Sequence, residues 1–371
     1  MEISVSRSDL LKELAATQGV VERKTTIPIL SNFLFEAEGD KLSITATDLD
    51  LSLRTACPAK VKKPGSCTIP ARKFYDYMKL LPDGDMSIKL LENHWVQVRL
   101  GRSNTKMVGM ARSNFPSVPV FPAAGALTLP AAILHTLISK TIFAISNEES
   151  RYTLNGALLV LKAESMTMVA TDGHRLAHIE NSGAKLEGVS GEMRTLIPKK
   201  AMAELHLLLQ SDGVETVEFG RDESTLFFRV GSRLLSSRML TGQFPNYEAV
   251  LPRETTRSVS VPCADIYNAI LRVAQFADER SGAIKLRLEK NELKVSSSSM
   301  ETGESEDSIE ASYDGDPLVI GFNSGYLLDF LKATGSGNVS FEFKDEQSAG
   351  QLRPLDGEDY KYRYVVMPMR I

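Results

Sequence analysis

Asp172, His174 and His178 are the residues of this chain whose types and spacing come closest to a reactive site. Carboxylate and imidazole groups at alternate positions of a strand can share one face, and such a set could hold a metal ion; a serine beside His174 would suggest a hydrolase. No further ligand cluster, nucleophile elbow or phosphate-binding loop accompanies them. Asp48, in an earlier stretch of the same form, has no histidine beside it. We therefore expect no catalytic residue, no metal and no cofactor, and we interpret Asp172 as a turn residue.

The turn belongs to a hairpin that the chain repeats. Met166–Glu180 indicates two strands joined at Asp-Gly, because Asp-Gly between apolar runs favours a tight hairpin turn. Leu42–Arg54 has the same pattern about 124 residues earlier, and Leu293–Met300, followed by an acidic run, is a weaker third copy. A repeat of this length is a whole domain. We predict three related domains, at residues 1–123, 124–252 and 253–371.

Each predicted domain combines two helices with a mostly antiparallel sheet, which is an α+β fold. Ser8–Ala16 has the start and the apolar face of a capped helix, and Ile69–Leu81 is a second helix with a proline near its first turn. Ile29–Phe35 is expected to be a strand, and the proline-rich Phe115–Pro122 an extended linker. The remaining four of six helices are predicted at 129–138, 197–209, 261–273 and 323–332.

Bulk composition is that of a soluble globular protein, with 371 residues, 43% apolar and 24% charged residues, and a formal net charge of −4. No apolar run reaches the roughly 18 residues of a membrane span, and the first residues lack the features of a signal peptide. Three cysteines without metal spacing favour a reducing compartment. We expect a cytoplasmic protein without a membrane partner.

Positive charge recurs where the predicted second helices begin. Arg72 and Lys73 open one of these helices, Lys199 and Lys200 open another, and Tyr326 stands at the matching place in the third. Two interpretations stay open for these positions. They are ordinary solvated helix surface, or they form a basic surface on an acidic chain that contacts the backbone of duplex DNA without reading its sequence.

Four motifs resemble the bacterial DNA polymerase III beta subunit family, the sliding clamps of replication. They are Arg151–Gly156, Ala170–Ala177, Phe244–Tyr247 and Tyr364–Arg370. The resemblance covers the whole chain. It implies a processivity factor without a catalytic site, made of three DNA-clamp domains per subunit. Two subunits would form a head-to-tail homodimer, a six-domain ring around duplex DNA.

The resemblance also implies a hydrophobic pocket between the middle and last domains. Short peptides of the replicative polymerase alpha subunit, the clamp loader and other replication and repair proteins would bind there. The matching residues are Leu154, Thr171, Gly173, His174, Arg175, Leu176, Pro245, Val250, Val365, Val366, Met367, Pro368, Met369 and Arg370. Where the family often has a basic pair, this chain has Glu248 and Ala249, which removes positive charge from the expected rim. For DNA contact, the resemblance points to Lys24, Arg72, Lys73, Arg151, Tyr152, Lys199, Lys200 and Tyr326.

A head-to-tail ring needs two different edges that complement each other. Arg102–Met107 is basic and Met300–Asp307 is acidic, so we predict that these edges pair between subunits. The alternative for the acidic run is a solvated edge that prevents aggregation. The expected dimer contacts are Arg102, Lys106, Met107, Phe276, Glu301 and Glu304.

Two other classes of protein stay possible on the residues alone: an enzyme built around His174, and an interaction scaffold that does not touch DNA. A clamp stays bound to circular DNA and a scaffold does not, so a retention measurement separates these two classes. Metal analysis of the protein tests the enzyme interpretation.

Overall fold

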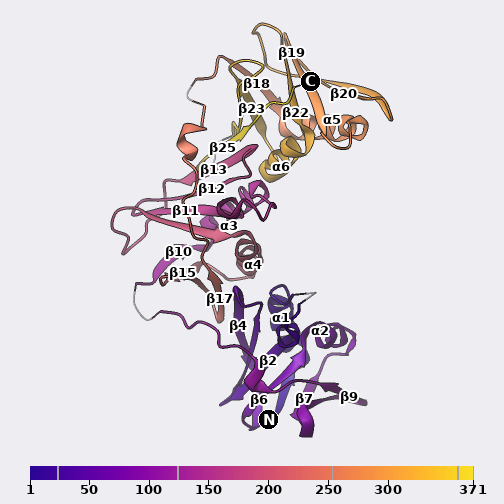
Figure 1. The fold of residues 1–371 in the computed structure, drawn as a ribbon, viewed down its shortest axis with the longest axis vertical. Helices are drawn as coiled ribbons and strands as arrows, with labels where there is room; N and C mark the ends of the chain where they lie inside the picture. Colours follow the sequence, from indigo (N-terminus) through magenta and orange to yellow (C-terminus); the bar gives the residue numbers. More distant parts are fainter. Residues whose placement is uncertain (23–24, 123–124, 253, 357–358, 371) are drawn as a thin grey trace. The chain divides into compact units, whose positions relative to one another are not determined.

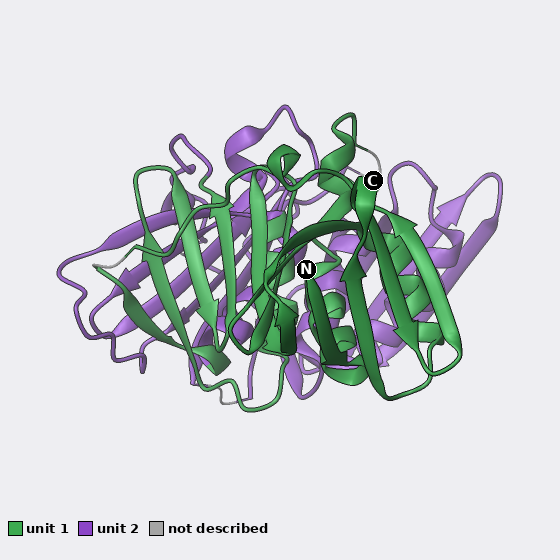
Figure 2. Ribbon diagram, turned by 90° about the horizontal axis from the view of Figure 1, so that it is seen from below, with its two compact units in different colours: residues 1–132, 200–239 green, residues 133–199, 240–371 purple. Residues whose placement is uncertain are grey.

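The computed structural model describes the chain except for residues 23–24, 123–124, 253, 357–358 and 371 (Figure 1). The chain forms two compact units (Figure 2). Unit 1 comprises residues 1–132 and 200–239, and unit 2 comprises residues 133–199 and 240–371. Each unit therefore combines segments that are far apart in the sequence.

Six α-helices are present among the described residues, as predicted. They are α1 (Arg7–Thr17), α2 (Ala71–Leu80), α3 (Ala131–Ser139), α4 (Lys199–Leu209), α5 (Cys263–Val273) and α6 (Ser324–Thr334). In unit 1, α1 and α2 lie side by side, and in unit 2, α5 and α6 do so (Figure 1). Apolar residues on one side of each helix hold it on a sheet; the ring of Phe74 in α2, for example, lies 5.6 Å from that of Phe35. None of the described helices has the length and apolar character to cross a membrane.

Unit 1 contains two antiparallel sheets. The five-stranded sheet has the order β5 (Lys60–Lys63), β1 (Glu2–Ser6), β7 (Asp85–Leu90), β8 (Trp95–Leu100), β9 (Ser103–Val108). The eight-stranded sheet has the order β10 (Leu127–Pro130), β15 (Thr216–Arg221), β16 (Thr225–Val230), β17 (Arg233–Arg238), β4 (Leu51–Pro58), β3 (Lys41–Thr47), β2 (Asn32–Glu38), β6 (Gly65–Pro70). The β9 strand is an edge of the smaller sheet.

Unit 2 repeats this arrangement with one eight-stranded and one four-stranded sheet. The larger sheet has the order β14 (Met193–Pro198), β11 (Gly156–Lys162), β12 (Ser165–Thr171), β13 (Arg175–Asn181), β25 (Tyr360–Val366), β24 (Gly350–Pro354), β23 (Asn338–Phe343), β18 (Arg257–Pro262). The smaller sheet has the order β21 (Gly303–Glu310), β20 (Glu292–Ser299), β19 (Ala283–Glu289), β22 (Leu318–Asn323). The acidic β21 is an edge.

The two units do not follow the three predicted domains, because two strand pairs join neighbouring domains. Strand β17 pairs with β4, with Leu235 opposite Leu53. Strand β13 pairs with β25, with Leu176 opposite Val365. Each eight-stranded sheet thus takes strands from two of the predicted domains. The boundaries near residues 123 and 252 stay a prediction.

The predicted hairpin repeat is confirmed in the turn geometry of two of its three copies. The Asp172 carboxylate accepts from the backbone N–H groups two and three residues further on, over 2.9 and 3.0 Å. The Asp48 carboxylate does the same, over 3.0 and 2.6 Å. Between them, Gly173 has a φ of 91° and Leu49 a φ of 84°, so both turns use the left-handed region. Asp172 is a turn residue, as its counterpart indicated.

Two local predictions were inaccurate. The strand expected from Ile29 begins only at Asn32, because Pro28–Ser31 forms a 3-10 turn with Pro28 in its first position. The first helix begins at Arg7, and its N-cap is Ser6 rather than Ser8, with the Ser6 hydroxyl accepting from the N–H of Asp9 over 3.5 Å.

Candidate functional site

An apolar cavity of about 130 Å³ opens beside the last strand of unit 2. The turn between β12 and β13 supplies one side, and β25 with the residues after it supplies the other. The two sides are tied together, since the N–H of Met367 donates to the carbonyl of His174 over 2.9 Å. The lining residues are Leu154, Thr171, Gly173, His174, Arg175, Leu176, Pro245, Tyr247, Val250, Val365 and Met367.

The floor of this cavity is part of the hydrophobic core of unit 2. Leu176, Tyr247 and Val365 are buried in one cluster, and Leu154 packs against it. Above the floor, Val250 is 44% exposed and Met367 is 45% exposed. Exposed apolar side chains over a packed apolar base favour an apolar ligand, and methionine adapts its shape to what it binds.

Arg175 forms a rigid wall of the cavity. Its guanidinium contacts Asp172 at 3.0 Å and Asp329 at 2.6 Å, and it donates to the carbonyl of Phe143 over 2.6 Å. The same group lies 4.4 Å from the centre of the Tyr326 ring. Burial disfavours the charge of Arg175, but Tyr364 and the two carboxylates raise its pKa and keep it protonated. Because these contacts use its donors, Arg175 positions the turn more than it offers charge to a ligand.

His178 is buried and packs against Tyr247 of the cavity lining. Its ring is 5.6 Å from that of Tyr247, and burial lowers the pKa of the imidazole. The residue that follows Tyr247 is the exposed Glu248. Glu248 is not among the lining residues, and its effect on the charge of the rim stays a prediction.

Ten of the fourteen predicted pocket residues line the cavity, and four do not. Successive side chains of a strand point to opposite faces, so Val366 is buried on the side opposite Val365. Beyond β25 the chain turns to another element, where the N–H of Met369 donates to the carbonyl of Gly321 over 2.8 Å. The last three predicted residues, Pro368, Met369 and Arg370, line a separate groove with Val319, Ile320, Gly321, Glu346 and Gln347.

Tyr247 lines the cavity although we did not predict it. It belongs to the Phe-Pro-Asn-Tyr motif, and its position two residues after Pro245 was the available signal.

Replacing Gly173 by alanine tests the turn that shapes the cavity. The φ of 91° is strained for any side chain, and a Cβ would lie 2.7 Å from Nη1 of Arg151. We expect the free energy of unfolding to fall by about 1–2 kcal/mol, measured by urea denaturation. Gly183→Ala is the control, because a Cβ there meets only ordinary contacts and its φ is not positive. Equal midpoints for the two variants would disprove the role of this turn.

The predicted DNA-contacting residues fall into two groups. Arg72 and Lys73 are exposed in the first turn of α2, and Tyr152 is 50% exposed. Three of the other residues already contact side chains of this chain. Lys200 pairs with Asp48, Lys199 donates to the Asn147 side chain over 2.7 Å, and Arg151 pairs with Glu148 at 2.8 Å.

Lys199 and Tyr326 of the predicted DNA-contacting set are also partly buried. Burial lowers the pKa of Lys199, and Tyr326 lies beneath the Arg175 guanidinium. Lys24 lies outside the described residues. Both basic pairs lie in the first turn of their helices, as the second and third residues of α2 and the first and second residues of α4, where the helix dipole adds positive potential. Their contact with DNA stays a prediction.

The strands expected to form the dimer contacts, β9 and β21, are edge strands of their sheets. Lys106 is exposed on β9, and Arg102 is exposed in the turn before that strand. Met107 is only 6% exposed and faces its own sheet's core, whereas Phe276 is 37% exposed. Glu301 and Glu304 are exposed at the start of the β21 region. What β9 offers a partner is therefore its backbone edge and the side chains of Arg102 and Lys106.

No group of three or more His, Cys, Asp or Glu side chains in the described part of the chain is arranged to hold a metal ion. Both carboxylate oxygens of Asp172 already accept hydrogen bonds within the turn.

Comparison with known proteins matches the chain to one family along its length. Models of the DNA polymerase III beta subunit match residues 1–119 (N-terminal domain), 128–246 (central domain) and 248–370 (C-terminal domain). The chain is 36% identical to the beta sliding clamp of Caulobacter vibrioides, with both chains covered completely. The crystal structure of the DNA polymerase III subunit beta of Pseudomonas aeruginosa has a TM-score of 0.92 at 34% identity, again covering 100% of each chain. The sliding clamp of Bartonella birtlesii, solved bound to griselimycin, has a TM-score of 0.93 at 34% identity and the same coverage.

A match that runs through all three domains and the full length of both chains indicates one class of protein, the replication sliding clamp. The chain belongs to the DNA polymerase III beta subunit family. It functions as a processivity clamp, which keeps partner proteins on DNA.

Proposed function

We propose that two copies of the chain join head to tail into a closed ring that surrounds duplex DNA, and that the cavity beside β25 binds short apolar peptides of partner proteins. The partners are the replicative polymerase alpha subunit, the clamp loader, and other replication and repair proteins. The observation that carries the proposal is the cavity itself, whose apolar floor and exposed Val250 and Met367 suit an apolar side chain. We place its action in the cytoplasm, where replication occurs in bacteria.

The mode of peptide binding follows from the lining residues. Leu154, Val365 and Met367 would surround an apolar side chain, and the fixed turn at Gly173 would shape the entrance. Arg175 holds that turn through Asp172 and Asp329, so the cavity is formed before a peptide arrives. A preformed cavity loses less entropy on binding than a flexible one. The acidic Glu248 at the rim favours peptides that lack acidic flanking residues.

DNA would be held by enclosure and weak phosphate contacts. The exposed Arg72 and Lys73 in the first turn of α2 offer charge without a fixed hydrogen-bonding geometry. Such contacts carry no sequence information and give a binding constant that falls with salt. A ring with only such contacts can slide. We assign no catalytic role to the chain, because a clamp of this kind acts by tethering.

Ring closure would pair the basic edge at β9 with the acidic edge at β21. Reversing two charges, with Glu301→Lys and Glu304→Lys together, would place like charges opposite Arg102 and Lys106. We expect this variant to sediment as a monomer where the parent chain sediments as a dimer. The control carries the same reversals at Glu164 and Glu223, which are exposed in the β11–β12 and β15–β16 turns. A variant that stays dimeric at the parent's concentration range would rule out this pairing.

Retention on DNA circles tests the whole proposal. The chain, loaded with a clamp loader onto nicked circular DNA, should stay bound through gel filtration in high salt. It should leave once the circle is cut to linear DNA. A protein that stays bound to the linear form binds by affinity, and one that never stays bound is a scaffold without DNA; either result rejects the ring.

A further inference from the structure

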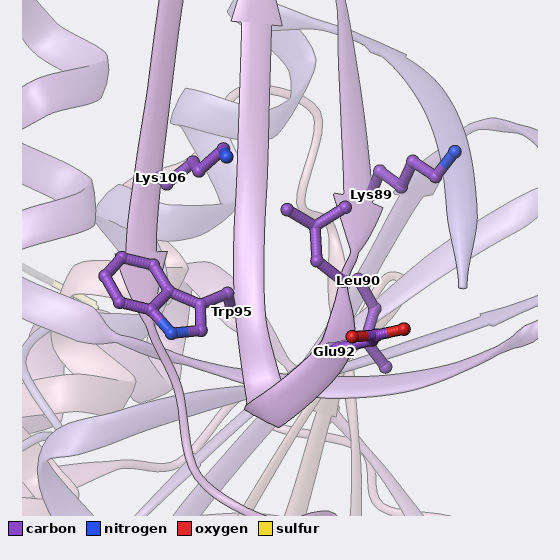
Figure 3. A pocket seen from close by; sticks show the side chains of 6 residues that line it. Lys89, Leu90, Glu92, Trp95 and Lys106 are labelled. Atoms are coloured by element: carbon purple, nitrogen blue, oxygen red, sulfur yellow. The ribbon is translucent and has the colours of Figure 1, made fainter.

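A second groove lies in unit 1, on the five-stranded sheet (Figure 3). Its volume is about 760 Å³, and it is lined by Lys89, Leu90, Leu91, Glu92, Trp95 and Lys106. We call it the tryptophan groove. Trp95 is the single tryptophan of the chain, and it is 40% exposed. Figure 3 shows Lys89 and Lys106 on opposite sides of the groove, with Trp95 and Glu92 nearer one end.

The groove is on the face of the sheet away from α2. Val96, Val98 and Met107 are buried toward the helices, and Thr105 of β9 donates to the hydroxyl of Tyr77 in α2 over 2.9 Å. Strand side chains alternate between faces, so Trp95 and Lys106 point to the opposite, open face. Pairing at the edge of β9 would use its backbone in the plane of the sheet. Backbone pairing of this kind leaves the side chains of Lys89 and Trp95 uncovered, whereas Lys106 is also one of the predicted dimer contacts.

The two lysines and the tryptophan have a defined spacing. Lys89 on β7 and Lys106 on β9 both lie opposite Gln97 of β8. Their backbones are thus two strand spacings apart, about 10 Å, and Trp95 lies two residues along β8, about 7 Å from Gln97. Two cations and an indole in this arrangement can contact two carboxylates and one large apolar side chain of an extended segment. Tryptophan is among the residues that contribute most to protein interfaces.

The turn before Trp95 fixes the tryptophan backbone. Asn93 and His94 have φ values of 54° and 62°, both in the left-handed region. The N–H of Leu91 donates to the carbonyl of Trp95 over 2.7 Å, and the N–H of Gly109 donates to the carbonyl of His94 over 3.0 Å. These bonds fix the point at which the Trp95 side chain leaves the sheet.

Charge favours an acidic partner. The five strands carry six cationic and two acidic side chains, on a chain whose net charge is −4. The cationic residues are Lys60, Lys62, Lys63, Lys89, Arg99 and Lys106, and the acidic ones are Glu2 and Asp85. Lys89 pairs with Glu2 at 3.2 Å and still leaves 47% of its side chain exposed. Glu92 would repel carboxylates from its end of the groove and so orient the segment toward the lysines.

We propose that the tryptophan groove is a second docking surface of the clamp, which takes an acidic polypeptide segment with one large apolar side chain from a partner protein. This surface is separate from the cavity beside β25. A partner that used both would be held at two points, and its effective affinity would exceed that of either contact.

Tryptophan fluorescence tests the proposal directly, because the emission of the full-length dimer comes from Trp95 alone. The probe is the acetylated peptide Asp-Asp-Ile-Asp-Asp amide, titrated in low salt. We expect a saturable blue shift of the emission, and no shift with the peptide Lys-Lys-Ile-Lys-Lys. In the Lys89→Glu variant the apparent Kd should rise at least tenfold. Lys60→Glu, the same charge change on the far edge strand β5, should change it less than twofold.

Three results would overturn the inference. One is the absence of a shift with the acidic peptide, and another is an equal effect of the two lysine variants. The third is a shift with a single-stranded dT10 oligonucleotide and none with the peptide, which would assign the groove to base stacking. If Lys89→Glu still sediments as a dimer, its effect on peptide binding does not come from a loss of ring closure. Met367→Asp, which alters the cavity beside β25, should leave the emission titration unchanged because the two surfaces are separate.

Discussion

Met367→Asp is expected to weaken binding of the polymerase-derived apolar peptide by roughly 30-fold. Met367 is 45% exposed over the apolar floor formed by Leu176 and Val365, so a bound peptide would cover it. A carboxylate there would lose water without gaining a partner, at about 2 kcal/mol, and each 1.4 kcal/mol corresponds to a tenfold change in Kd. The change can be measured by fluorescence polarisation with a labelled peptide.

Met300→Asp is the matched control for this prediction. Met300 is fully exposed at the β20–β21 turn, so the same substitution there should leave the Kd unchanged. Gel filtration should show that both variants are folded. If Met367→Asp bound the peptide as tightly as Met300→Asp, the cavity beside β25 would not be the peptide site.

Arg233→Ala is expected to lower the free energy of unfolding by about 3–5 kcal/mol, because it leaves a buried carboxylate without its partner. Arg233 of β17 contacts both oxygens of Glu13 in α1, with Nε and Nη2 each at 2.9 Å. Each of the two residues is only 8% exposed. The Thr55 hydroxyl also donates to Glu13, and Ser211 accepts from Arg233 over 2.9 Å. Thermal or urea unfolding measures the loss.

Arg238→Ala provides the control for the buried pair. Arg238 lies 3.3 Å from Asp50, but both side chains are more than two-thirds exposed, so its loss should cost less than about 1 kcal/mol. A similar cost for both arginine variants would show that the Glu13–Arg233 pair contributes little. Replacing both partners by apolar residues should cost less than Arg233→Ala alone.

The pH dependence of this pair has a definite sign. Burial acts to raise the pKa of Glu13, but hydrogen bonds from Arg233 and Thr55 outweigh it and lower the pKa below the ordinary 4.5. The pair's stabilisation is therefore present above about pH 4.5 and is lost as the pH falls through the lowered pKa. In Arg233→Ala burial acts against Thr55 and the Lys12 charge alone, so the pKa of Glu13 should rise, and the deficit relative to the parent should shrink as the pH falls and the carboxylate is protonated.

Local patterns predicted the elements well, because each depends on neighbouring residues. Asp172 and Gly173 define their turn by themselves, and Asp48 repeats it. The six helices follow from apolar spacing, and in α2, α3, α4 and α5 also from the proline just before the first residue. The start of the strand expected from Ile29 was wrong by three residues, because Pro28 starts a 3-10 turn whose bonds do not need a sheet partner.

Features that depend on distant residues were not predictable from one sequence. The role of Arg175 depends on Asp329, 154 residues away, and the Glu13–Arg233 pair spans 220 residues. The terminal residues show the same limit. The motif that ends the chain was expected to line one pocket, but the strand alternation at Val366 and the pairing of Met369 with Gly321 send its members to different places. Three-dimensional position, and not motif membership, decides which residues share a cavity.

Small-angle X-ray scattering of the purified chain most directly tests whether two copies close a ring. The account predicts a dimer of the 40.8 kDa chain whose distance distribution is that of a hollow particle wide enough for duplex DNA. A monomer, or a dimer whose distribution fits a filled particle, would contradict it.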